Sequence, residues 1–167
     1  MTSPQSNFLA ASKMGIGAWA WGDRMFWGYG QGYQITDIEE AFRICLDAGV
    51  NFIDTAEVYG QGKSEVILGE LLKKHQRRVF VATKFMPYPW RLSKSSLKKA
   101  LKKSLTRLQL SSVDLYQMHW PIPPIAIETW MEAMFEVVQA GLVRSVGVSN
   151  YDHQQTERAF TKLTAEG

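Results

Sequence analysis

The stretch that decides the fold is residues 79–119, which read VFVATKFMPYPWRLSKSSLKKALKKSLTRLQLSSVDLYQMH. Nearly continuous apolar runs at 79–84 and 113–119 are typical of parallel strands buried on both faces. Between them, leucines recur at steps of three and four residues: Leu97, Leu101, Leu105 and Leu108. This spacing predicts an amphipathic helix that starts at Ser93 and keeps its lysines on the outside. The stretch therefore predicts a strand, a crossover helix and a second parallel strand.

The same alternation continues along the rest of the chain. Further strands are predicted by short runs rich in Val, Ile and Phe, at residues 14–19, 51–54 and 143–149. Further helices are predicted from the N-cap Thr36 to Gly49, after Lys63, over 126–139, and from Asn150 or Asp152 onward. Five successive βα units indicate an α/β protein with a parallel sheet.

Two architectures are built from such units, a closed eight-stranded barrel and an open doubly wound sheet. Periodicity alone does not choose between them. The run GIGAWA at residues 15–20 lacks the third glycine of a Rossmann dinucleotide fingerprint. The sequence therefore gives no support to a Rossmann nucleotide site.

Composition is that of an ordinary globular domain, with 167 residues, a net charge of +3 and 46% hydrophobic residues. The one cysteine, Cys45, excludes an internal disulfide and favours a reducing compartment, so we expect a cytoplasmic location and leave an organelle open. No apolar run approaches ~18 residues, and no aromatic residue interrupts the lysine-rich helix, so neither a membrane span nor nucleic-acid binding is predicted. Residues 1–13 do not resemble a secretory signal and are expected to precede a domain of residues 14–167.

Functional side chains of a parallel α/β fold gather at the C-terminal ends of its strands. This rule collects Asp54, Lys84 and His119 from three successive strands, and Tyr59 from the loop after Asp54. Each residue also has an ordinary structural explanation: a loop cap, a lysine that reaches toward solvent, a satisfied buried imidazole and a packed ring. Their joint placement favours a single reactive site.

The four side chains suit the delivery of a proton to a carbonyl oxygen. A phenol with a pKa of about 10 is a slow donor at neutral pH. We expect the Lys84 ammonium to lower the pKa of Tyr59, and Asp54 to keep Lys84 charged and oriented. We expect His119 to donate a hydrogen bond to the substrate oxygen. No metal site is predicted.

Four motifs resemble those of the aldo-keto reductase family. They read NFIDTAEVYG at 51–60, VATKF at 81–85, VDLYQMHWP at 113–121 and GLVRSVGVSN at 141–150. Their order and spacing resemble the family over nearly the whole chain from Met14 onward. Residues 17–23 and 89–92 are most similar to the plant and cyanobacterial members that resemble pyridoxal reductases.

The resemblance implies a partial (β/α)8 TIM barrel, with about five βα units present and the C-terminal three missing. It implies an oxidoreductase that reduces aldehydes and ketones with NADPH, in which Tyr59 is the acid, Lys84 and Asp54 tune it, and His119 orients the substrate. Residues implied to contact the nicotinamide end of the cofactor are Ala18, Trp19, Asp54, Ser149 and Asn150. Helix N-capping is the alternative role for Ser149 and Asn150.

Tryptophans near the same strand ends are expected to form an apolar wall for planar carbonyl substrates. The candidates are Trp21, Trp90 and Trp120, with Trp19 and Trp27 beside them. Packing in the protein interior is the alternative for each ring.

The sequence ends before the part of the family pattern that carries a nicotinamide-stacking aromatic residue and a basic clamp for the adenosine phosphate. We therefore expect weak cofactor binding and turnover near background. We also expect the first and fifth strands to expose edges that allow self-association. Three alternatives stay open: a non-enzymatic cofactor-sensing or regulatory subunit, an inactive barrel fragment, and an unrelated barrel isomerase or aldolase with a Schiff base at Lys84.

Overall fold

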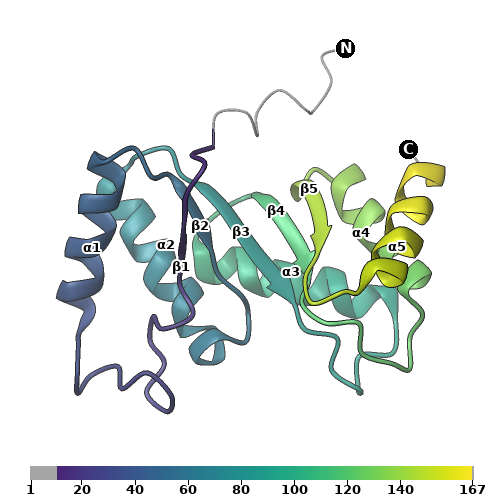
Figure 1. Ribbon diagram of the computed structural model, residues 1–167, viewed down its shortest axis with the longest axis horizontal. Coiled ribbons are helices and arrows are strands. Elements are labelled where there is room, and N and C mark those ends of the chain that lie inside the picture. Colours follow the sequence, from purple (N-terminus) through teal and green to yellow (C-terminus); the bar gives the residue numbers. More distant parts are fainter. Residues whose placement is uncertain (1–10, 167) are drawn as a thin grey trace.

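The computed structural model describes residues 11–166, in which five strands alternate with five α-helices (Figure 1). The strands are β1 (Gly15–Gly17), β2 (Phe52–Asp54), β3 (Phe80–Phe85), β4 (Val113–Met118) and β5 (Val143–Val148). The helices are α1 (Ile35–Asp47), α2 (Lys63–His75), α3 (Lys94–Leu108), α4 (Ile127–Gln139) and α5 (His153–Glu166), and a short 3-10 helix, η3 (Tyr59–Gly62), precedes α2. Most of the expected N-terminal segment, residues 1–10, lies outside the described part of the chain.

The five strands form one parallel sheet in the order β1-β2-β3-β4-β5. Each strand therefore pairs with the strand that precedes it in the sequence. A doubly wound sheet reverses its direction of growth after the first strands, whereas a barrel adds every strand on the same side. The strand order confirms the expected fold, five consecutive βα units of a barrel.

Side chains alternate along each strand between the side of the sheet that faces the helices and the opposite, inner side. On β3, the Thr83 hydroxyl donates to Glu65 of α2 at 2.5 Å, and the Phe85 ring lies 5.0 Å from that of Trp130 on α4. Lys84 lies between these two residues in the strand and points to the opposite side. The register places Lys84 beside Gln117 of β4, so both side chains are on the inner side.

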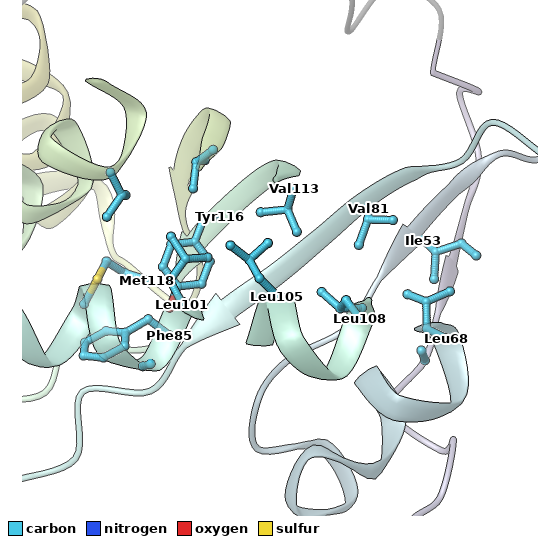
Figure 2. Close-up of a cluster of buried hydrophobic side chains, with 14 of the residues drawn as sticks. Ile53, Leu68, Val81, Phe85, Leu101, Leu105, Leu108, Val113, Tyr116 and Met118 are labelled. Atoms are coloured by element: carbon cyan, nitrogen blue, oxygen red, sulfur yellow. The ribbon is translucent and has the colours of Figure 1, made fainter. Parts of the chain in front are cut away.

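The core lies between the sheet and the helices. Figure 2 shows Leu101, Leu105 and Leu108 of α3 directed at side chains of β3 and β4. All four leucines predicted for this stripe are buried, each stabilising the fold by about 2 kcal/mol relative to exposure. The lysines of α3 lie on the exposed side, as predicted: Lys98, Lys99, Lys102 and Lys103.

The structure corrects one predicted helix start and chooses between two alternatives for another. The predicted N-cap Thr36 is wrong, because α1 starts two residues earlier, with Gln34 as its N-cap. Asp37 accepts a hydrogen bond from the Gln34 backbone N–H at 2.7 Å, and this bond fixes the earlier start. For α5, Asp152 is the cap: its carboxylate accepts from the Gln155 N–H at 2.8 Å.

Helices α2 and α3 pack closely through a glycine and a buried ion pair. A Cβ atom at Gly69 would lie 2.5 Å from the backbone oxygen of Arg107, so only glycine allows this approach. Nearby, the fully buried Glu65 accepts from Arg107 Nε at 2.7 Å. Further hydrogen bonds satisfy both charges: the Thr83 hydroxyl donates to Glu65, and Arg107 donates to the Ser104 hydroxyl.

Residues 11–166 contain neither a candidate membrane span nor a candidate metal-binding cluster. No helix in this range is long and apolar enough to cross a membrane. The same range contains no group of three or more His, Cys, Asp or Glu side chains that could hold a metal ion.

Candidate active site

The structure brings together the four polar side chains that the sequence singles out. Lys84 Nζ lies 2.5 Å from Asp54 Oδ2 and 3.4 Å from the Tyr59 hydroxyl. The rings of Tyr59 and His119 meet edge to face, with their centroids 5.7 Å apart. A carboxylate, an ammonium, a phenol and an imidazole therefore share one site at the C-terminal ends of β2, β3 and β4.

Tyr59 is held in place by an unusual turn at the start of η3. Gly60 and Gln61 have left-handed backbone angles, with φ of 52° and 56°. A Cβ atom at Gly60 would come within 3.0 Å of the backbone of Gly22, so the turn also needs a bare backbone here. This turn presents the phenol to Lys84 immediately before α2 begins.

Burial controls the proton affinities of Tyr59 and Lys84. Burial, with a further contribution from the Asp54 carboxylate, raises the pKa of Tyr59 above its ordinary value. The prediction that Lys84 gives Tyr59 a lowered pKa is therefore wrong in its net direction, because loss of solvent and the Asp54 carboxylate both raise the pKa. Burial also lowers the pKa of Lys84, and Asp54 partly offsets that effect.

His119 is neutral at physiological pH. Burial, and then the nearby Lys84 charge, lower the pKa of His119 to about 4. Its Nδ1 atom is buried with no hydrogen-bond partner among the described residues. A buried acceptor without a partner is less costly than a buried N–H without one, so the ring proton belongs on Nε2. The neutral ring can then donate a hydrogen bond from Nε2.

The residues implied for cofactor contact surround the same site. Ser149 and Asn150 follow β5, where Asn150 Nδ2 donates to the His119 backbone oxygen at 2.8 Å and to Ser149 Oγ at 3.1 Å. Ala18 is fully buried, and its N–H donates to the Asp54 backbone oxygen at 2.8 Å. The Trp19 ring is half exposed, with its centroid 6.2 Å from that of Tyr59.

The tryptophans expected to line the substrate pocket divide into two groups. Trp90 and Trp120 are exposed, at 72% and 45%. Trp21 is only 7% exposed and packs edge to face on Phe42 of α1. The expectation for Trp21 is therefore wrong, since its ring belongs to the core beneath the β1–α1 loop.

Gln117 and Glu57 are site residues that the sequence reasoning missed. The Gln117 amide donates to Asp54 Oδ1 at 3.2 Å, so the Asp54 carboxylate is held from both sides. Gln117 lies two residues before His119 in a strand, a spacing that puts both on one side of the sheet and could have identified it. Glu57 lies between Asp54 and Tyr59 and forms a buried ion pair with Arg91.

Fold and site together define a barrel-type α/β protein with a phenol, an ammonium, a carboxylate and an imidazole gathered at the C-terminal ends of its strands. A family model described as "Aldo/keto reductase family" matches residues 13–166. The chain belongs to this family, as its motifs indicate.

Relatives and solved structures agree with this assignment. The chain is 38% identical to the chloroplastic pyridoxal reductase of Arabidopsis thaliana, over 95% of this chain and 47% of that protein. It is 38% identical to the aldo-keto reductase YhdN of Bacillus subtilis, over 97% of this chain and 51% of that protein. An aldo-keto reductase from Klebsiella pneumoniae, solved in complex with NADPH, superposes with a TM-score of 0.77 at 31% identity, covering 91% of this chain and 50% of that one. The chain thus spans about half the length of these proteins, and the resemblance to pyridoxal reductases is confirmed.

Proposed function

We propose that this chain carries the proton-donating part of an NADPH-dependent reductase of aldehydes and ketones, with Tyr59 as the general acid. One observation carries the proposal: the buried Lys84 ammonium contacts the Asp54 carboxylate and lies 3.4 Å from the Tyr59 hydroxyl. Planar, apolar carbonyl compounds are the proposed substrates, because Trp19, Trp90 and Trp120 are exposed near the strand ends.

Tyr59 holds its proton until the substrate oxygen becomes negative. Its raised pKa keeps the phenol protonated at neutral pH. When charge develops on the carbonyl oxygen, the hydroxyl gives up its proton, and the phenolate left behind is stabilised by Lys84. Asp54 keeps Lys84 charged and aimed at the phenol.

His119 orients the carbonyl oxygen in this proposal. A neutral imidazole with its proton on Nε2 donates one directed hydrogen bond and does not compete with Tyr59 as an acid. Its position beside the Tyr59 ring supports donation to the same oxygen.

The residues present fit the nicotinamide end of a dinucleotide. A Cβ atom at Gly17, beside Asp54 in the sheet register, would meet nothing within 4 Å, which leaves room for a planar ring. Ser149 and Asn150 offer the hydroxyl and amide groups that an amide ligand needs, and Ala18, Trp19 and Asp54 complete the proposed contacts. The bound nicotinamide would supply the hydride, and relatives solved with NADPH and NADP support this choice.

The Tyr59→Phe variant tests the proposal. We expect it to abolish whatever NADPH-dependent reduction of an aromatic ketone the wild type shows above background, because the acid is lost. The measurement is oxidation of NADPH followed by absorbance, with NADPH binding followed by tryptophan fluorescence. The matched control, Tyr29→Phe, removes a hydroxyl outside the site and should keep wild-type activity.

Three outcomes would contradict the proposed enzyme. Turnover that survives in Tyr59→Phe would exclude Tyr59 as the acid. Wild-type binding of NADPH without turnover would favour a cofactor-sensing subunit, and absence of both would favour an inactive barrel fragment.

We also propose self-association and a reducing compartment. Among the described strands, β1 and β5 each have only one neighbour, which supports pairing between chains. A chain with one cysteine suits the cytoplasm or, as for the relative named chloroplastic, a plastid.

A further inference from the structure

A nearly buried ion pair joins two loops at the catalytic end of the sheet. Glu57 lies in the segment between Asp54 and Tyr59, and Arg91 lies in the loop that follows β3. Their side chains are 8% and 19% exposed. Arg91 Nη2 donates to Glu57 Oε2 at 3.0 Å, and Nη1 donates to Oε1, so the contact is bidentate.

The ion pair is also bonded to the backbone of the second loop. Glu57 Oε1 accepts from the Met86 N–H at 2.8 Å, and Arg91 Nη1 donates to the Met86 carbonyl oxygen at 2.7 Å. Both backbone polar groups of Met86, two residues after Lys84, are therefore held by the pair. Any movement of this loop relative to the Tyr59 segment must break charged hydrogen bonds, which are stronger than neutral ones.

Arg91 extends the connection to two aromatic rings. Its guanidinium lies 5.2 Å from the Tyr88 ring centroid and 4.8 Å from that of Phe85. The Tyr88 ring stacks on Trp90, with centroids 4.6 Å apart and planes 6° from parallel. We call these two stacked rings the Tyr88–Trp90 pair.

Burial does not explain how the Trp90 ring is held in the Tyr88–Trp90 pair. Trp90 is 72% exposed, so little of its ring is removed from water. The contacts that hold it are the ring of Tyr88 and, through Tyr88, the cation of Arg91. A large, flat and accessible aromatic surface held by an ion pair is the geometry of a stacking site rather than of core packing.

We propose that Glu57 and Arg91 are positioning residues that fix the Tyr88–Trp90 pair to the segment that carries Tyr59, so that the site prefers flat aromatic carbonyl compounds to aliphatic ones. The ordering of the two rings is independent of the proposed function. The preference for aromatic over aliphatic carbonyl compounds rests on the proposed function, because that preference assumes that Tyr59 is the reacting group.

The ordering of Trp90 is tested by fluorine NMR of protein labelled with fluorotryptophan, with the Trp90 signal assigned from a Trp90→Phe variant. We expect the Trp90 signal of the wild type to be displaced by the stacked Tyr88 ring, and Glu57→Gln to lose that displacement. Glu128→Gln is the matched control, because Glu128 forms an equally bidentate pair with Arg158, at 2.8 and 2.9 Å, between α4 and α5. The signal of the buried Trp130 reports whether each variant keeps its fold.

Two results of this measurement would overturn the inference. One is that the Trp90 signal is unchanged in Glu57→Gln while the Trp130 signal is retained. The other is that the Trp90 signal changes equally in Glu128→Gln. If Glu57→Gln loses the Trp130 signal, Arg91→Lys decides in its place, since it keeps the cation and removes the bidentate contact.

The preference for aromatic compounds is tested by titration with acetonaphthone and hexanone, observed on the same Trp90 signal and without turnover. We expect Glu57→Gln to bind acetonaphthone about tenfold more weakly than the wild type, and hexanone with unchanged affinity. In the turnover assay the same variant should raise the KM for acetonaphthone more than the KM for hexanone. Equal affinity of wild type and variant for acetonaphthone would overturn the positioning role, whereas absence of wild-type turnover alone would defeat only the proposed function.

Discussion

At the scale of single residues, the Lys84 ammonium organises the site. It donates to three oxygens, those of the Asp54 carboxylate, the Thr55 backbone and the Tyr59 hydroxyl, so all three of its N–H groups have partners. A nearly buried cation is tolerated only while such partners are present. Asp54 is therefore needed for stability as well as for the proposed chemistry.

Replacing Asp54 tests this dependence. We expect Asp54→Asn to lower the free energy of unfolding at neutral pH by about 2 kcal/mol or more, because it leaves the Lys84 charge without its counterion. The double variant Asp54→Asn, Lys84→Met should recover much of this loss, since the buried cation is gone too. Urea unfolding of the three proteins measures the difference, and a double variant less stable than Asp54→Asn would contradict the explanation.

His119 makes stability depend on pH over a defined window. Its pKa is about 4 in the folded protein against an ordinary value of 6.5, so between these values the unfolded chain binds more protons. Stability is therefore complete above about pH 6.5 and is lost as the pH falls toward 4, by about 3 kcal/mol at most. We expect His119→Gln to flatten this part of the curve of unfolding free energy against pH. If the unfolding free energies of the wild type and of His119→Gln changed with pH at the same slope in this window, the His119 imidazole would be accessible to protons in the folded protein.

The sequence predicts individual site residues well when they end strands. Asp54, Lys84 and His119 follow from one rule about parallel sheets. The direction of the Tyr59 pKa does not follow, because it depends on solvent access that no local pattern records. The Glu57–Arg91 pair is likewise hidden, since the partners are far apart in sequence and either charge reads as an exposed loop residue.

At the scale of elements, the contact between α2 and α3 fixes where the Tyr59 segment lies. Helix α2 starts directly after η3, and it meets α3 through Gly69 and the buried Glu65–Arg107 pair. Helix α3 is in turn packed on β3, the strand of Lys84. Tyr59 and Lys84 are thus placed by neighbouring helices as well as by neighbouring strands.

Gly69→Ala tests the closeness of this contact. Alanine normally stabilises a helix interior by about 1 kcal/mol relative to glycine. Here the new Cβ would be 2.5 Å from a backbone oxygen, so we expect a net loss of about 2 kcal/mol in unfolding free energy. Chemical denaturation measures it, with Gly32→Ala as the control, since a Cβ there would meet only one atom, at 3.9 Å. A stabilised Gly69→Ala protein would show that α2 and α3 are further apart.

Elements with a regular pattern are the ones the sequence predicts. The leucine spacing of α3 and the Val-rich strands locate these elements to within one or two residues. η3 is not predicted, because two successive left-handed residues at its start leave no periodic signal. Trp21 is misplaced for a related reason: the left-handed Gly22 that follows it belongs to a turn, and the side on which a loop residue lies depends on such turns.

At the scale of the whole molecule, the sheet has two outer edges. The outer sides of β1 and β5 carry no strand among residues 11–166, and β5 carries Val143, Val146 and Val148. Strand edges of this kind pair with other strands. Local periodicity did not reveal this arrangement, because a doubly wound sheet has the same pattern of elements and different edges.

We expect the protein to associate as its concentration rises. Sedimentation velocity should show a shift from monomer to dimer or larger species, and added salt should not reverse it, since strand pairing relies on backbone hydrogen bonds and apolar contact rather than on charge. A single monomeric species at every concentration would contradict pairing through β1 or β5.

The sequential strand order also bears on how the chain folds during its synthesis. Among the described strands, each of β2 to β5 pairs with the strand made immediately before it, so these four pairings need no strand that is synthesised later. β2 can dock on β1, and β3 on β2, while later units are still being translated. The four side chains of the candidate site, carried by β2 to β4 and the loops that follow them, can therefore assemble on the nascent chain before β5 has emerged.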